Sequence, residues 1–193
     1  MIEIKNATKK YGKYKSAQTV LENFSLTLES GSKTVITGAS GIGKTTLLRI
    51  LAGLEKPDGG EFFSDEKVAV MFQEPRLLPW KTALENVAVV LPNGKKELAD
   101  KYLSLVELEE DKNKFPHELS GGMAQRVALA RFLAFAEADG STLLLLDEPF
   151  SALDYTTAEK MLALLRDFAN GKTVLLVAHH LPDISFADEI FAL

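Results

Sequence analysis

A glycine-rich run followed by a lysine and a hydroxyl is the feature of this sequence most suited to chemistry. Residues 38–45 read Gly-Ala-Ser-Gly-Ile-Gly-Lys-Thr, which fits the spacing G-x-x-x-x-G-K-S/T of a phosphate-binding loop. Glycines let the backbone turn tightly and point its N–H groups at a phosphate chain. Lys44 can reach the outer phosphates, and the Thr45 hydroxyl can ligate Mg²⁺. The residues predicted to hold the phosphates of a nucleotide are Gly38, Ala39, Ser40, Gly41, Ile42, Gly43, Lys44, Thr45 and Thr46.

The segments on either side of this loop fit a strand and a helix. Residues 34–37 are β-branched, which is typical of a short strand, and residues 46–52 carry apolar side chains at helical spacing. A helix that begins here adds the partial positive charge of its N-terminus to the phosphate site. A glycine-rich turn without a ligand is the alternative, and the agreement between the motif and its flanks disfavours it.

A second glycine pair lies far along the chain, where Gly121 and Gly122 stand between Ser120 and Met123. Serine is a preferred helix N-cap, and the apolar residues that follow repeat with a helical period. Alone, this is an ordinary helix start. Together with the first loop, the run Leu-Ser-Gly-Gly-Met resembles the signature motif of the ABC-type ATPases, with Met123 in place of the commoner glutamine. The resemblance implies that these four residues bind ATP.

Two acidic residues end an apolar run. Residues 143–146 are four leucines, followed by Asp147 and Glu148. The run predicts a central parallel strand buried on both faces, and α/β folds bind ligands at the carboxyl ends of such strands. The resemblance makes this the Walker B strand. It implies that Asp147 holds Mg²⁺ and that Glu148 is the general base that polarises water. A solvated acidic strand end is the alternative.

Gln73 and His179 each follow a further apolar segment. In the family, the matching glutamine contacts Mg²⁺ and water, and the matching histidine contacts the γ-phosphate. The resemblance therefore implies a catalytic role for both residues, with Gln73 also near the metal. His180 is the competitor of His179, and a surface glutamine or a solvated histidine are the alternatives.

Tyr11 matches the aromatic residue that stacks on the adenine ring in this family, and the resemblance implies that role here. Stacking gives modest selectivity for ATP, because every base has a π-face. Tyr14 is the competitor, and a surface tyrosine is the alternative.

The composition excludes several classes of function. Hydrophobic residues make up 46% and charged residues 25% of the 193 residues, as in globular proteins. A net charge of −5 predicts no nucleic-acid partner. With no cysteine there is no disulfide and no thiolate metal site. No apolar run approaches the roughly 18 residues that span a bilayer, and the start has no signal-peptide pattern.

The alternation of strand and helix signals predicts an α/β fold. We expect a P-loop NTPase core with a mostly parallel sheet, an N-terminal antiparallel β region and an inserted helical subdomain. Residues 1–193 are predicted to form one ABC ATPase domain, with residues 1–73 and 139–193 as the core and residues 74–138 as the helical subdomain. Within the latter, residues 81–90 and 95–108 have amphipathic helical patterns. The early stop at Leu193 leads us to expect no C-terminal regulatory domain.

The resemblance also implies partners. ATP and Mg²⁺ would bind between two ATPase subunits, in a homodimer, with each signature motif covering the ATP on the other subunit. Transmembrane permease subunits and an extracytoplasmic solute-binding protein would complete the assembly. The chain would then be cytoplasmic and peripheral on the inner face of the membrane.

Residues 72–80, Phe-Gln-Glu-Pro-Arg-Leu-Leu-Pro-Trp, particularly resemble the nitrate/sulfonate/taurine importer ATPases. Leu77, Leu78 and Trp80 are candidates for an apolar floor on which a permease docks. The alternative is that they pack the helical subdomain onto the core.

The sequence thus predicts an ATP-hydrolysing subunit that powers an ABC transporter, importing a small solute. The alternative within the family is a soluble ABC ATPase that acts on a macromolecular partner. A P-loop kinase is a third class, but such an enzyme has no reason to carry the run at residues 119–123.

Overall fold

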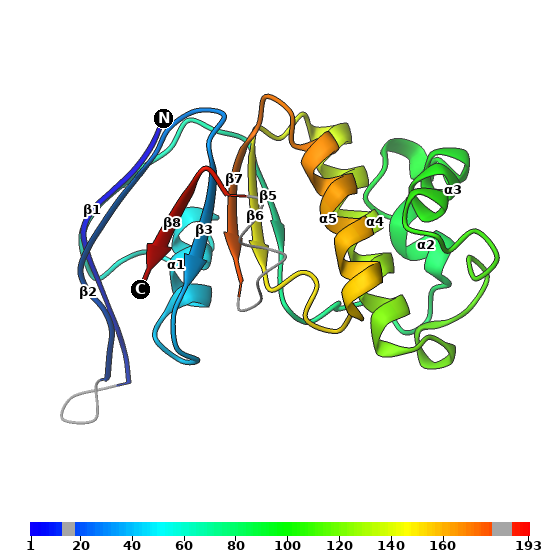
Figure 1. Cartoon of the computed structure of the whole chain (residues 1–193), viewed down its shortest axis with the longest axis horizontal. Coiled ribbons are helices and arrows are strands. Elements are labelled where there is room, and N and C mark those ends of the chain that lie inside the picture. Colours follow the sequence, from blue (N-terminus) through cyan, green and yellow to red (C-terminus); the bar gives the residue numbers. More distant parts are fainter. Residues whose placement is uncertain (13–17, 179–186) are drawn as a thin grey trace.

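The computed structural model describes residues 1–12, 18–178 and 187–193 (Figure 1). Its strands are β1 (Ile2–Tyr11), β2 (Gln18–Leu28), β3 (Lys33–Thr37), β4 (Gly59–Phe63), β5 (Val68–Met71), β6 (Leu143–Asp147), β7 (Thr173–Val177) and β8 (Glu189–Ala192). Its helices are α1 (Lys44–Leu51), α2 (Ala83–Ala88), α3 (Lys96–Leu105), α4 (Gly121–Asp139) and α5 (Tyr155–Phe168), with short 3₁₀ turns at Pro92–Gly94 and Pro116–Glu118. No helix of the described part is both long and apolar enough to cross a membrane.

The larger sheet is parallel throughout and has the strand order β5-β6-β7-β3-β8. The predicted mostly parallel sheet is therefore confirmed. Because β3, β5 and β6 run in the same direction, the segments that follow them emerge at one edge of the sheet. These segments carry the glycine-rich loop, Gln73 and the Asp147–Glu148 pair.

The leucines of β6 alternate between two hydrophobic clusters. Leu143 and Leu145 pack in the cluster that contains α1 and the inner face of the antiparallel sheet. Leu144 and Leu146 pack in the cluster that contains α4, α5 and the other helices. Every residue of β6 and β7 is buried, since helices cover both faces of the sheet. Figure 1 shows this layering, with α1 on one side of the parallel sheet and α4 and α5 on the other.

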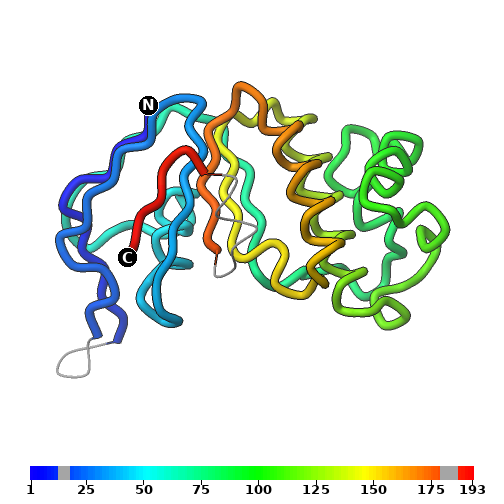
Figure 2. The backbone as a smooth tube through the Cα atoms, viewed as in Figure 1, coloured from blue at the N-terminus to red at the C-terminus, as the bar shows by residue number. Residues whose placement is uncertain are grey.

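The smaller sheet is antiparallel, in the order β2-β1-β4. Figure 2 shows β1 and β2 side by side along one end of the molecule, with both termini nearby. β4 is absent from the sequence-based prediction. The glycine pair at its start suggests a turn. In the structure Gly60, with φ +82°, crosses β1 so closely that a Cβ would lie 2.4 Å from the Asn6 carbonyl oxygen.

Helices α2, α3 and α4 lie between β5 and β6 in the chain, so the predicted insertion is helical. α2 and α3 lie on the far side of α4 and α5 from the sheet (Figure 1). α2 begins with a capping box in which Thr82 and Glu85 satisfy each other's backbone N–H groups. Tyr102, which is 1% exposed, donates a hydrogen bond to Glu137, and so ties α3 to α4.

Candidate active site

The glycine-rich loop connects β3 to α1 through backbone geometry that only glycine accepts. Gly43 has φ +120°, and a Cβ on it would lie 2.8 Å from the carbonyl oxygen of Val20 in β2. Gly38 has φ +150°, and a Cβ there would lie 2.8 Å from the carbonyl oxygen of Leu193. Both glycines are needed for conformation and for space. The loop is therefore held tightly between β2 and the end of the described chain.

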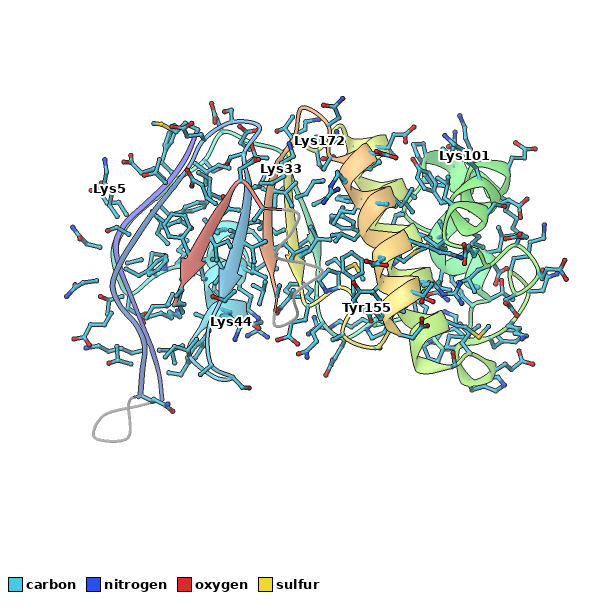
Figure 3. The ribbon with its side chains drawn as sticks, in the orientation of Figure 1. Lys5, Lys33, Lys44, Lys101, Tyr155 and Lys172 are labelled. Atoms are coloured by element: carbon cyan, nitrogen blue, oxygen red, sulfur yellow. The ribbon has the colours of Figure 1, made fainter. Side chains whose placement is uncertain are left out.

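Lys44 lies inside the loop and is 6% exposed. Its Nζ donates hydrogen bonds to the carbonyls of Gly38, at 2.7 Å, and Ala39, at 2.9 Å. Figure 3 shows Lys44 at the carboxyl ends of the parallel strands, whereas Lys33 and Lys172 lie at the opposite edge of the sheet. An ammonium group beside a helix N-terminus forms a cradle suited to phosphate.

Thr45 and Asp147 are brought together from α1 and β6. The Thr45 Oγ1 donates a hydrogen bond of 2.6 Å to Asp147 Oδ2. Burial raises the pKa of the Asp147 carboxyl above its ordinary value, and the hydrogen bond from Thr45 acts in the opposite direction. A hydroxyl and a carboxylate are hard oxygen donors of the kind that Mg²⁺ prefers. The two residues therefore fit the predicted Mg²⁺ site.

Gln73 and Glu148 form the second pair. Gln73 Nε2 donates a hydrogen bond of 2.8 Å to Glu148 Oε2. Glu148 has φ +46°, and its backbone N–H donates to the carbonyl of Val177 in β7. These contacts hold its carboxylate next to the phosphate-binding loop. The cleft that results has a volume of about 270 Å³ and is lined by Val20, Ser40, Gly41, Gly43, Lys44, Thr45, Thr46, Gln73 and Glu148.

Tyr11 ends β1 beside the first turn of α1. Its hydroxyl lies 3.4 Å from Thr46 Oγ1 and donates a hydrogen bond to Glu55. Its side chain is partly open, and the residue is 37% exposed. The competitor Tyr14 lies outside the described residues, as do His179 and His180.

The Ser-Gly-Gly-Met run begins α4, as the sequence predicts. Ser120 is the N-cap, and its Oγ accepts a hydrogen bond of 3.2 Å from the backbone N–H of Met123. Together with Gly122 these residues line a separate hollow, whose other walls are Arg126, Ala152, Leu153, Asp154 and Thr157. Within the described residues, this hollow and the cleft have no lining residue in common. One chain thus does not bring Ser120, Gly121, Gly122 and Met123 to its own phosphate-binding loop.

Two residues near the site carry no motif and are missed by sequence reasoning. Val20 lines the cleft from β2, and Glu55 accepts the Tyr11 hydrogen bond. Val20 stands in a strand with no local signal for a ligand. Glu55 stands in a run with proline and glycines that indicates only a turn.

A lysine-bearing glycine loop at the carboxyl edge of a parallel sheet, next to an Asp-Glu pair on the neighbouring strand end, defines a P-loop ATPase. Comparison with known proteins narrows this class. The family model described as "ABC transporter" matches residues 21–151, and the chain belongs to that family. It is therefore an ATP-binding ATPase subunit of the kind that powers a transporter.

Curated relatives carry more specific names. The chain is 42% identical over 189 residues to the aliphatic sulfonates import ATP-binding protein SsuB 1 of Shouchella clausii. The matched region covers 94% of this chain and 75% of that relative. It is 43% identical over 196 residues to SsuB 2 of Pseudomonas syringae pv. syringae, covering 100% of this chain and 69% of the relative.

A solved structure supports the fold. The ATP-binding cassette MJ0796, in a dimeric post-hydrolysis state bound to ADP and Pi, superimposes with a TM-score of 0.91 at 34% identity. The match covers 100% of this chain and 94% of the other. The predicted P-loop NTPase core is thereby confirmed.

Proposed function

We propose that this chain hydrolyses MgATP as one of two ATPase subunits that drive import of a small organic solute through a permease. The names of its relatives favour an aliphatic sulfonate as the solute. The observation that carries the proposal is the arrangement around Lys44, where the Thr45–Asp147 pair and the Gln73–Glu148 pair meet at one cleft.

Each group in the cleft has a chemical role in this proposal. Lys44 and the backbone N–H groups of the loop bind the phosphates. Thr45 and Asp147 would hold Mg²⁺, which when bound neutralises charge on the phosphates. Glu148 takes a proton from the water whose oxygen attacks the γ-phosphorus, while the bond from that phosphorus to the bridging oxygen breaks. Gln73 orients the Glu148 carboxylate through the hydrogen bond of 2.8 Å.

The separation of the two hollows favours a two-subunit mechanism. The N-terminus of α4 offers backbone N–H groups and the Ser120 hydroxyl, but not to the cleft of its own chain. A second copy would supply them to that cleft, so that ATP joins the two subunits. His179 completes the proposed site near the γ-phosphate.

The proposed domain organisation and location follow from this role. Residues 1–73 and 139–193 would form the ATPase core and residues 74–138 the helical subdomain of one ABC ATPase domain. The chain would lie on the cytoplasmic face of the membrane, attached through a permease that receives solute from an extracytoplasmic binding protein.

The residues expected to face the permease differ in how exposed they are. Leu77 is partly buried and packs against the main hydrophobic cluster, so part of its surface is already covered within this chain. Trp80 is 68% exposed and remains available. Beside this segment lies a hollow of about 140 Å³ whose lining includes Phe72, Arg76 and Phe135. We assign permease docking to Trp80 and this hollow.

Affinity capture from detergent-solubilised native membranes, with ATP present, tests the proposal. The tagged chain is expected to recover a multi-spanning membrane protein in near-equal amount, and Trp80→Ala is expected to recover several-fold less. Phe63→Ala is the matched control, because Phe63 is 64% exposed but lies on the antiparallel sheet. Recovery of only soluble partners would favour a non-transport ABC ATPase, and equal recovery by Trp80→Ala would remove Trp80 from the docking surface.

A further inference from the structure

The Tyr11 hydroxyl lies in a polar network that joins β1 to α1. It donates a hydrogen bond to Glu55 Oε2 and lies 3.4 Å from Thr46 Oγ1. A phenol has one proton to donate, so Thr46 must be the donor in the second contact. Thr46 directly follows the lysine and threonine of the phosphate-binding loop. The hydroxyl end of the ring is thus fixed relative to that loop.

Glu55 is itself held in place by two cations. Arg49 Nη1 lies 3.3 Å from Glu55 Oε1, and Lys9 Nζ lies 4.0 Å from Oε2. Lys9 also lies over the Tyr11 ring, 5.6 Å from its centroid, and donates to the carbonyl of Lys56 at 2.7 Å. One carboxylate oxygen therefore faces Arg49, while the other faces Tyr11 and Lys9.

We propose that Glu55 is a positioning residue for nucleotide recognition, because it fixes the Tyr11 ring in the orientation that stacks on the base. This inference rests on the proposed ATP-binding function and on the stacking role that the family resemblance implies for Tyr11. Lys9 lies over one face of the ring, and Tyr11 is still 37% exposed, so part of its surface is open to a ligand. A ring that is oriented beforehand loses less freedom on binding, and so the affinity for the base is higher. Glu55 acts through Tyr11, and both residues lie beside the cleft rather than in its lining, joined to it through Thr46.

The experiment compares ATP with inorganic tripolyphosphate, which has the phosphates but no base. In Glu55→Ala, the Kd for MgATP is expected to rise about fivefold, the usual effect of one hydrogen bond. The Kd for tripolyphosphate, measured by competition, stays at the parent value. Glu55→Gln keeps an acceptor oxygen and recovers most of the ATP affinity. In a Tyr11→Phe background, Glu55→Ala adds little, because the hydroxyl is already gone.

Asp58→Asn is the matched control. Asp58 also lies near Lys9, at 3.7 Å, and its carboxylate accepts the backbone N–H of Lys10 at 2.7 Å. The asparagine keeps an acceptor and removes the charge, so the Kd for ATP should not change. An equal rise of the Kd in Asp58→Asn would show an effect of charge alone and overturn the proposal.

Two other results would also overturn it. An unchanged Kd for ATP in Glu55→Ala would show that Glu55 does not contribute to nucleotide binding. Equal weakening of ATP and tripolyphosphate would show damage to the phosphate-binding loop instead. The proposed function has a separate test, because a parent chain that binds ATP without hydrolysing it would contradict that function. The Kd values would still decide whether Glu55 positions Tyr11.

Discussion

At the scale of single residues, the two carboxylates of the site differ in environment and so in role. Asp147 is 3% exposed, and burial raises its pKa, so its charge is costly unless a cation lies beside it. Such a group is suited to hold a metal ion. Glu148 is less buried and accepts a hydrogen bond from the neutral amide of Gln73. It is suited to accept a proton from water.

Gly43→Ala tests the loop geometry at the same scale. We expect it to lower the free energy of unfolding by about 1–3 kcal/mol and to weaken ATP binding, because it combines a positive φ with a backbone clash at 2.8 Å from Val20. Gly41→Ala is the matched control, since it also has positive φ, +79°, but no atom lies within 4 Å of its added Cβ. Urea unfolding measures both variants, whereas ATP titration measures Gly43→Ala alone, because Gly41 itself lines the cleft. Equal losses of stability in the two variants would show that the contact with β2 does not matter.

At the scale of elements, α4 links the signature run to the Gln73 segment. Ser120 caps its start, and Arg131, further along, donates hydrogen bonds to the carbonyls of Pro75, at 2.6 Å, and Arg76, at 3.1 Å. Arg76 has φ +45°, so this clamp holds a backbone that few residues adopt freely. A movement of α4 would therefore be transmitted to the segment that carries Gln73.

Elements with strong local signals were predictable, and those that depend on distant pairing were not. The buried leucine run of β6 and the capped start of α4 follow directly from residue type and spacing. β4 has no such signal, because its two glycines indicate a turn and its pairing with β1 is non-local. For the same reason the sequence predicts the Thr45–Asp147 pair only through a family resemblance, whereas the sheet order brings the two together.

At the scale of the whole molecule, the hollow at the N-terminus of α4 and the phosphate-binding cleft are lined by different residues of one chain. Each complete site in the proposed mechanism therefore needs two copies of the chain. Lys44→Ala disables the phosphate-binding loop of its own subunit, and Ser120→Arg disables the signature run that its subunit supplies to the other copy. A mixed dimer of the two contains one site with neither change.

Refolding the two inactive variants together should restore activity. About a quarter of the parent ATPase rate is expected, because half of the dimers are mixed and each has one intact site. The rate of the co-refolded mixture is compared with that of each variant refolded alone. A rate no higher than the sum of the separate variants would show that sites are not shared between subunits.

The most direct test of the central claim is ATP hydrolysis by Glu148→Gln, with ATP affinity measured on the same preparation. The substitution removes the proposed general base, because the amide that replaces the carboxylate cannot accept a proton from water at neutral pH. We expect the hydrolysis rate to fall about a hundredfold or more while the Kd for MgATP stays within about twofold of the parent value. A variant that hydrolyses ATP at the parent rate would contradict the assignment of this cleft as the catalytic site.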